Sequence, residues 1–172
     1  MNFQPSNQHQ KFFVEHILAA GKKYTKPKPM ATLRRTDFGK DGFLDCYNSF
    51  NQYLRWHYSG TDRDMINSFV QNFGATYQTT YDGGYPEKLY RDLTFLQKKQ
   101  VPNLSQPGKS IIGINDPKDL SQVIDYLYVI RCNFNHGSFS VHDELYQSIA
   151  IPSFEVFYLI LFKILRHEIP NQ

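Results

Sequence analysis

Apolar side chains recur along this chain with the spacing of an α-helix, while alternation with a period of two residues is hard to find. This pattern predicts an all-α fold. The 172 residues fit one domain, which is long enough to bury a core without disulfides or a structural metal. We therefore expect a single domain over residues 1–172, built as a bundle of about six helices.

The N-terminal part of the pattern predicts one helix and a connector. The helix is expected within residues 1–21, roughly from Gln8 to Ala20, with Gly21 as its stop signal. Residues 22–38 then contain prolines at alternate positions, which favour extended backbone. We expect this segment to be a connector that leads into a helical core over residues 39–168.

The first half of the core pattern predicts three helices. One runs from about Gly42 to Tyr58, and a second opens where Thr61 and Asp64 provide an N-cap and ends at the turn of residues 81–84. A third follows Pro86, which suits a first helical turn. The aromatic-rich stripe of the first helix comprises Phe43, Cys46, Tyr47, Phe50, Tyr53, Leu54 and His57.

The second half begins with residues 100–115, where prolines and glycines predict an irregular segment. A fifth helix is expected to follow it, capped by Asn115 or Asp116. The last apolar segment, residues 142–167, contains Pro152. Because proline disrupts a helix interior, this segment is expected to be either two helices or one kinked helix.

Composition adds a few constraints. The two cysteines, Cys46 and Cys132, are far apart and show no metal-ligand spacing, so neither a disulfide framework nor a zinc site is predicted. The chain starts with a polar segment rather than a secretory signal, and Glu155 and Lys163 interrupt its most apolar run. We expect a cytoplasmic protein without a membrane span, a metal or a cofactor.

The net charge of +3 does not identify a nucleic-acid binder by itself. Its distribution is more informative, because residues 21–35 hold several basic side chains and no acidic one. These basic residues are Lys22, Lys23, Lys26, Lys28, Arg34 and Arg35. The segment is either a solvated basic linker or an electrostatic footprint for RNA.

An arginine interrupts the apolar stripe of the fifth predicted helix. One face of this helix is defined by positions spaced by four or three residues, namely Leu120, Ile124, Leu127, Arg131 and Phe134. Arg131 therefore lies among apolar side chains. A buried guanidinium without partners is costly and cannot lose its proton, so Arg131 requires a compensating group.

A histidine near the end of the same helix is a candidate companion. His136 lies about 140° from Arg131 on a straight helix. Gly137 favours a left-handed helix end, which places His136 in the last turn or at the C-cap, from which its ring can turn toward Arg131. Asn135, four residues after Arg131, can join them on that side.

These residue types suit phosphodiester chemistry. An arginine neutralises the phosphate and the charge of the transition state, and a histidine removes or returns a proton near neutral pH. In RNA the 2′-hydroxyl is a nucleophile held beside its own phosphate, so this chemistry requires no metal. The pattern thus indicates RNA rather than DNA as a substrate.

The segment IRCNFNHG, residues 130–137, resembles the R-x4-H signature of the HEPN superfamily. That superfamily consists of all-helical domains, many of them metal-independent ribonucleases of toxin–antitoxin and antiphage systems. The tail HDELYQSIAIPSFEVFYLILFKIL and the upstream segment DCYNSFNQYLRWHY, which includes Phe50 and Asn51, are similar to the corresponding parts of Apea-like members.

The resemblance implies that Arg131 and His136 form a catalytic pair. The residue after the arginine is usually polar in the superfamily, whereas this chain has Cys132 there. The third catalytic contributor is then Asn133 or Asn135.

The resemblance further implies a homodimer in which two R-x4-H motifs face each other across a cleft. Such a cleft would also accommodate Arg131 without burial in a dry core. RNA is the implied substrate, cleaved to 2′,3′-cyclic phosphate and 5′-hydroxyl ends. An antitoxin or defence-system protein is an implied partner, although Ser138 replaces the tyrosine that a nucleotidyltransferase antitoxin modifies in related toxins.

Two other interpretations stay open. In the first, the chain is a HEPN module that binds RNA or protein as a dimer without catalysis. In the second, it is an ordinary helical bundle whose motif match is coincidental. The ordinary bundle predicts that Arg131 pairs internally with an acidic side chain, for which Asp143 and Glu144 are candidates.

Overall fold

The computed structural model describes residues 32–82, 87–104, 111–136 and 143–165. Within these ranges the chain is mostly helical, which confirms the all-α prediction. The elements are α2 (Thr32–His57), α3 (Asp62–Asp82), α4 (Glu87–Gln97), β1 (Val101–Pro102), β2 (Ile111–Ile112), α5 (Leu120–Asn135) and α6 (Glu144–Leu165). The helix expected around residues 8–20 lies outside the described residues.

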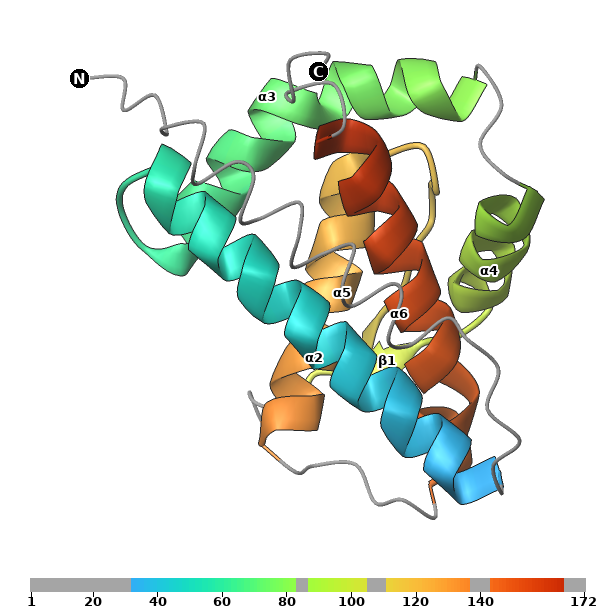
Figure 1. Cartoon of the computed structure of the whole chain (residues 1–172). Coiled ribbons are helices and arrows are strands. Elements are labelled where there is room, and N and C mark those ends of the chain that lie inside the picture. The colour runs from blue at the N-terminus through green and yellow to red at the C-terminus, as the bar shows by residue number, and fades with distance from the viewer. Residues whose placement is uncertain (1–31, 83–86, 105–110, 137–142, 166–172) are drawn as a thin grey trace, which may run out of the picture.

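The two longest helices, α2 and α6, pack against each other more extensively than any other described pair (Figure 1). α5 lies beside them and also contacts α3 and β1, while α4 packs on α6. The helix that carries the R-x4-H segment is therefore supported by several elements at once.

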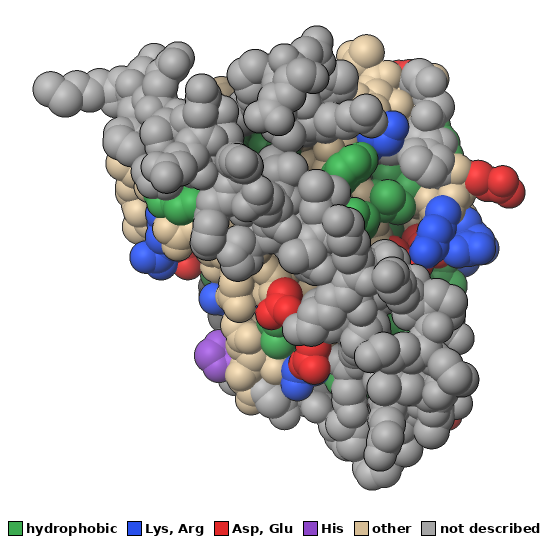
Figure 2. All heavy atoms as spheres, in the orientation of Figure 1, with side chains coloured by type: hydrophobic (Ala, Val, Ile, Leu, Met, Phe, Trp, Pro, Cys, Tyr) green, Lys and Arg blue, Asp and Glu red, His purple; other side chains and the backbone are tan. Residues whose placement is uncertain are grey.

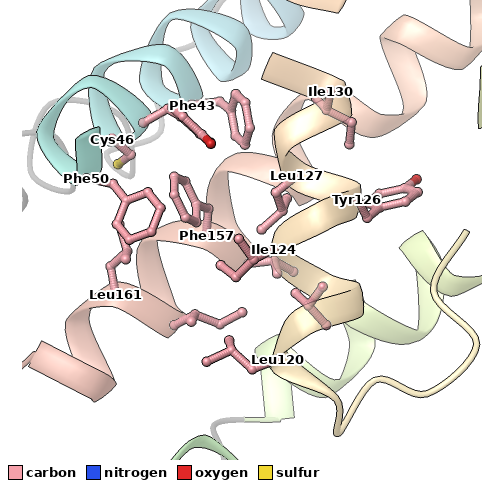
Figure 3. Close-up of a cluster of buried hydrophobic side chains, with 14 of the residues drawn as sticks. Phe43, Cys46, Phe50, Leu120, Ile124, Tyr126, Leu127, Ile130, Phe157 and Leu161 are labelled. Carbon is pink, nitrogen blue, oxygen red and sulfur yellow. The ribbon is translucent and has the colours of Figure 1, made fainter. Parts of the chain in front are cut away.

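The core lies where α2, α5 and α6 meet. Phe43 and Phe50 of α2 point toward Phe157 of α6, with ring centroids 5.6 Å and 5.4 Å from it (Figure 3). Leu127 of α5 and Leu161 of α6 are fully buried in the same cluster. Every member of the stripe predicted on α2 is buried or half-buried, as its helical spacing requires.

A glycine sets how closely α2 and α6 approach each other. A Cβ placed on Gly39 would lie 2.8 Å from Cγ1 of Ile151 and 2.9 Å from its backbone nitrogen. Real Cβ atoms essentially never make contacts this short, so a side chain at position 39 would push the helices apart. A Cβ on Gly74 of α3, in contrast, would have no atom within 4 Å.

The connector expected over residues 22–38 is too long at its C-terminal end, because α2 begins at Thr32. The residues from Thr32 to His57 have ordinary helix propensity and include no proline, so nothing in the local sequence delays the start of the helix. The helix predicted from Gly42 to Tyr58 therefore starts earlier than expected, while its end at His57 agrees with the prediction.

The start of α3 and the continuity of α6 test two further predictions. The Asp64 N–H donates to Thr61 Oγ1 at 3.3 Å and the Thr61 N–H donates to Asp64 Oδ2 at 3.0 Å, which confirms the predicted N-cap.

Pro152 lies inside α6, which is one continuous helix rather than two. The apolar side chains buried on both sides of Pro152 offset its cost of about 3 kcal/mol.

The cap predicted for α5 is wrong. The N-cap is Asp119, whose carboxylate accepts the N–H of Ser121 at 2.9 Å. Asn115 and Asp116 lie before the helix, and their N–H groups instead donate to Oε1 of Gln122 at 3.0 Å and 3.1 Å. The Gln122 side chain therefore closes this turn, a contact that local sequence preferences do not reveal.

The segment expected to be irregular, residues 100–115, contains a minimal antiparallel hairpin. Val101 pairs with Ile112 and Pro102 pairs with Ile111. Each strand has only 2 residues, which is too short to produce a recognisable alternating pattern.

α6 is long and apolar enough, by length and composition alone, to cross a membrane. In this fold it contacts α2, α3 and α4, and half of its side chains are buried there. Burial inside the described fold therefore accounts for its apolar composition.

Two carboxyl groups meet where α4 packs on α6. Asp92 is 6% exposed, and in the described part of the chain no donor group reaches its Oδ2. Glu155 contacts Asp92, and the Lys88 Nζ lies 2.6 Å from Glu155 Oε1. Two carboxyl groups can share a hydrogen bond only when one is protonated. Burial and the contact with Asp92 accordingly raise the pKa of Glu155, while Lys88 opposes this shift.

Basic and acidic side chains are also grouped on the molecular surface on the side where α4 lies (Figure 2). Lys88 and Arg91 of α4 form ion pairs with Glu155 and Asp92. The carboxyl pair is thus flanked by cations, although none of the described cations reaches the buried Asp92 Oδ2.

Gly39→Ala tests the close approach of α2 and α6. We expect it to lower the free energy of unfolding by about 1–3 kcal/mol, because the added methyl group clashes with Ile151. The matched variant Gly74→Ala should instead raise it by about 0.5–1 kcal/mol, since alanine favours a helix and meets no obstacle there. Urea denaturation measures both values, and equal effects of the two substitutions would contradict this assignment.

Glu155→Gln tests the carboxyl pair. Because the pKa of Glu155 is raised above its usual 4.5, the stability that its protonated form provides is present below pH 4.5 and is lost as pH rises through the raised pKa. Glutamine stays neutral and can donate to Asp92. The variant should therefore gain stability relative to the natural chain as pH rises above 4.5. Denaturation at several pH values checks this, with the exposed Glu87→Gln as control; parallel curves for Glu155→Gln and the natural chain would refute it.

Candidate functional site

Arg131 lies partly buried near the C-terminal end of α5. Its guanidinium carbon is 5.5 Å from the centroid of the Tyr47 ring, which projects from α2. The Nε atom is buried and has no hydrogen-bond partner in the described part of the chain. A cation over an aromatic face contributes about 0.5–2 kcal/mol, depending on how far it is desolvated. The ring therefore compensates part of the cost of placing this charge on an apolar face.

No acidic side chain among the described residues forms an ion pair with Arg131. The two candidate partners are used or placed differently: Asp143 accepts the N–H of Tyr146 at 3.1 Å, and Glu144 is exposed in the first turn of α6. The internal pairing predicted for an ordinary bundle is therefore not observed in the described residues.

Arg63 is a nearby arginine whose guanidinium is neutralised by an acidic side chain, and it serves as a comparison for Arg131. Arg63 of α3 forms a bidentate contact with Asp125 of α5, with distances of 2.5 Å and 3.1 Å. The side chains of Tyr47 and Tyr128 lie close enough to both Arg63 and Arg131 to affect their electrostatics. Of these two arginines, only Arg63 forms an ion pair with an acidic side chain among the described residues.

The tyrosines beside Arg131 do not supply a negative charge. Tyr47 is 1% exposed, and burial raises the pKa of its hydroxyl although the Arg131 guanidinium opposes this shift. Burial and contact with the Cys132 thiol raise the pKa of Tyr128 as well. Both phenols therefore stay protonated at neutral pH, and the positive charge of Arg131 remains available to an anion.

Cys132 occupies the position at which the HEPN superfamily usually has a polar residue. Its side chain is 5% exposed and contacts the half-buried Tyr128 one turn earlier on α5. Tyr128 thus brings a polar hydroxyl to the surroundings of Arg131. Sequence reasoning missed it because tyrosines at helical spacing are usually core residues.

His136 is the C-cap of α5, as predicted, and its side chain is exposed. Its N–H donates to the Cys132 carbonyl at 3.0 Å, and its φ of −84° and ψ of 5° lie in the bridge region, outside α-helical values. Gly137, which was expected to turn the ring toward Arg131, lies outside the described residues. No hydrogen bond or ring contact joins His136 to Arg131 within the described part of the chain.

The two candidate asparagines differ sharply. Asn135 is exposed next to His136. Asn133 is 0% exposed, its Nδ2 donates to the Pro102 carbonyl at 2.8 Å, and its Oδ1 accepts the Leu104 N–H at 3.1 Å. Its amide thus bonds the backbone beside β1 through both Nδ2 and Oδ1, which gives Asn133 a structural role, while its catalytic contribution stays a prediction.

The six basic residues proposed to contact RNA are only partly covered by the structure. Lys22, Lys23, Lys26 and Lys28 lie outside the described residues, and Arg34 and Arg35 belong to the first turns of α2. No group of three or more His, Cys, Asp or Glu side chains suited to a metal ion occurs among the described residues.

Comparisons with known proteins add no further assignment. No protein-family model matches the chain, and no significant match was found among curated proteins or solved structures.

Asn133→Ala tests the structural role of this residue. It removes the hydrogen bonds to the Leu104 N–H and the Pro102 carbonyl from a fully buried side chain, so we expect a loss of about 2 kcal/mol in the free energy of unfolding. Asn135→Ala, two residues away and exposed, should change stability by about 0.5 kcal/mol or less. Denaturant titration distinguishes the two variants, and equal stability of both would argue against a structural role for the hydrogen bonds of Asn133.

Proposed function

We propose that this chain is a metal-independent endoribonuclease of the HEPN type, folded as a single helical domain of about six helices that includes the segment before α2. The observation that carries the proposal is the guanidinium of Arg131, which lies over Tyr47 without an acidic partner in the described residues. Exposed His136 and Asn135 end the same helix. A charge held at a helix end beside a titratable ring suits binding and cleavage of a phosphodiester.

In the proposed reaction the 2′-hydroxyl oxygen of RNA attacks the adjacent phosphorus, and the bond between phosphorus and the 5′-oxygen breaks. His136 removes the proton from the 2′-hydroxyl or returns a proton to the leaving 5′-oxygen. Arg131 stabilises the negative charge on the phosphoryl oxygens. The products are a 2′,3′-cyclic phosphate and a 5′-hydroxyl.

The helical geometry favours a site that two subunits complete. On a regular helix, Arg131 and His136 point about 140° apart, and α5 is regular up to Asn135. Within one chain the two side chains therefore diverge, whereas across a two-fold axis the arginine of one subunit can face the histidine of the other. We accordingly propose a homodimer with the motif at its interface, acting in the cytoplasm with an antitoxin or defence-system partner.

The same divergence favours one alternative, in which the chain is an inactive HEPN module that binds RNA or a protein. Such a module would bind RNA through backbone contacts that weaken steeply with added salt, but it would produce no new RNA ends.

Arg131→Ala and His136→Ala test the proposed reaction. With chelator present, the purified natural chain should cleave RNA and leave 2′,3′-cyclic phosphate ends, and each variant should reduce the rate by at least about 100-fold. Mapping of RNA ends by sequencing measures the outcome. Gln52→Ala, at an exposed position of α2, serves as a surface control. Undiminished cleavage by either active-site variant would reject its catalytic assignment.

Mixing the two inactive variants tests the composite site. If each site takes its arginine and histidine from different subunits, random exchange should restore about a quarter of the natural activity, because half of the dimers then contain one intact site. A site completed within one subunit would show no recovery after mixing.

A further inference from the structure

Tyr47 is a core residue whose ring also meets the charge of Arg131. Its side chain is 1% exposed, and its hydroxyl has no hydrogen-bond partner among the described residues. The ring packs against Phe43, Phe50 and Phe157, with centroids 6.1 Å, 5.8 Å and 5.3 Å away. It is therefore held firmly by aromatic neighbours from α2 and α6.

The other face of interest on Tyr47 is the one that meets Arg131. The guanidinium carbon lies 5.5 Å from the ring centroid, and the Nε beside it is buried. In the described part of the chain, no hydrogen bond or ion pair orients the guanidinium of Arg131. Arg63, by comparison, is oriented by two contacts to Asp125. Among the described residues, it is thus the ring of Tyr47 that determines the position of the Arg131 guanidinium.

We infer that Tyr47 is a positioning residue for Arg131: its ring holds the inner part of the guanidinium and leaves the outer N–H groups directed at a phosphate. A carboxylate in this role would neutralise the charge and compete with the substrate, whereas an aromatic face orients a cation and preserves its charge. The consequence for cleavage rests on the proposed ribonuclease function. The placement of the guanidinium does not.

The experiment has one arm that needs no catalysis. A proton above an aromatic ring is shielded, so the Nε–H resonance of Arg131 in ¹⁵N-labelled protein should lie upfield of ordinary arginine resonances. Tyr47→Phe keeps the ring and should keep this shift. Tyr47→Leu should abolish it. An unshifted Arg131 resonance in the natural chain, or one unchanged in a folded Tyr47→Leu variant, would overturn the inference.

The second arm measures RNA cleavage by the same variants. Tyr47→Leu should lower kcat by about 10-fold or more, since a misplaced catalytic group slows the chemical step. Tyr47→Phe, which keeps the ring, should retain the kcat of the natural chain. Phe69→Leu is the matched control, because Phe69 of α3 is a fully buried ring that packs on Phe50 and Phe73 and makes no ring contact with Tyr47 among the described residues. It should destabilise the core without a comparable loss in kcat.

The two arms separate the two hypotheses. Absence of RNA cleavage by the natural chain would contradict the proposed function, while the resonance of Arg131 would still decide the positioning role. Cleavage with equal kcat losses in Tyr47→Leu and Phe69→Leu would show that Tyr47 acts only through the core, and would reject positioning.

Discussion

The contact of Phe157 with the rings of α2 is the interaction on which the described structure depends most. Phe157 lies within 5.6 Å of the ring centroids of Phe43, Tyr47 and Phe50. This contact fixes α2 on α6, and thereby fixes the ring over which Arg131 lies. Gly39, one turn before Phe43, allows the same two helices to approach closely beside this cluster. The position of a charged side chain on α5 is therefore set by apolar packing between two other helices.

Charge is handled in two ways around α5. Arg63 and Asp125 neutralise each other in an exposed pair, which contributes little to stability but leaves no net charge. Among the described residues, Arg131 meets an aromatic face and protonated phenols but no acidic partner, so within this part of the chain its charge is not neutralised in a partly desolvated place. Such a place strengthens the attraction of any anion that reaches it, because screening by water is reduced.

Helical periodicity predicted most of the described fold, since a stripe of apolar side chains depends on spacing alone. It placed the buried face of α2 and the continuation of α5 to its cap at His136 correctly. It failed where contacts distant in the sequence decide the outcome. It did not predict that Gln122 bonds the turn at Asn115, which was expected to cap α5. The hairpin of β1 and β2 was too short to be recognised.

The candidate site shows the same division. The position of Arg131 on an apolar face followed from spacing, but its ring partner Tyr47 is contributed by another helix and had no local signal. Asn133 looked equivalent to Asn135 in the sequence. Only the buried contacts with the backbone beside β1 show that its amide is already used.

The carboxyl pair of Asp92 and Glu155 has a consequence for the thermodynamics of folding as a whole. Between the usual pKa of a glutamate and the raised pKa of Glu155, the folded chain holds a proton that the unfolded chain gives up. Unfolding in that range therefore releases a proton to the buffer. The heat absorbed on unfolding then includes the heat with which the buffer takes up that proton, so calorimetric enthalpies depend on the choice of buffer even when its pH is unchanged.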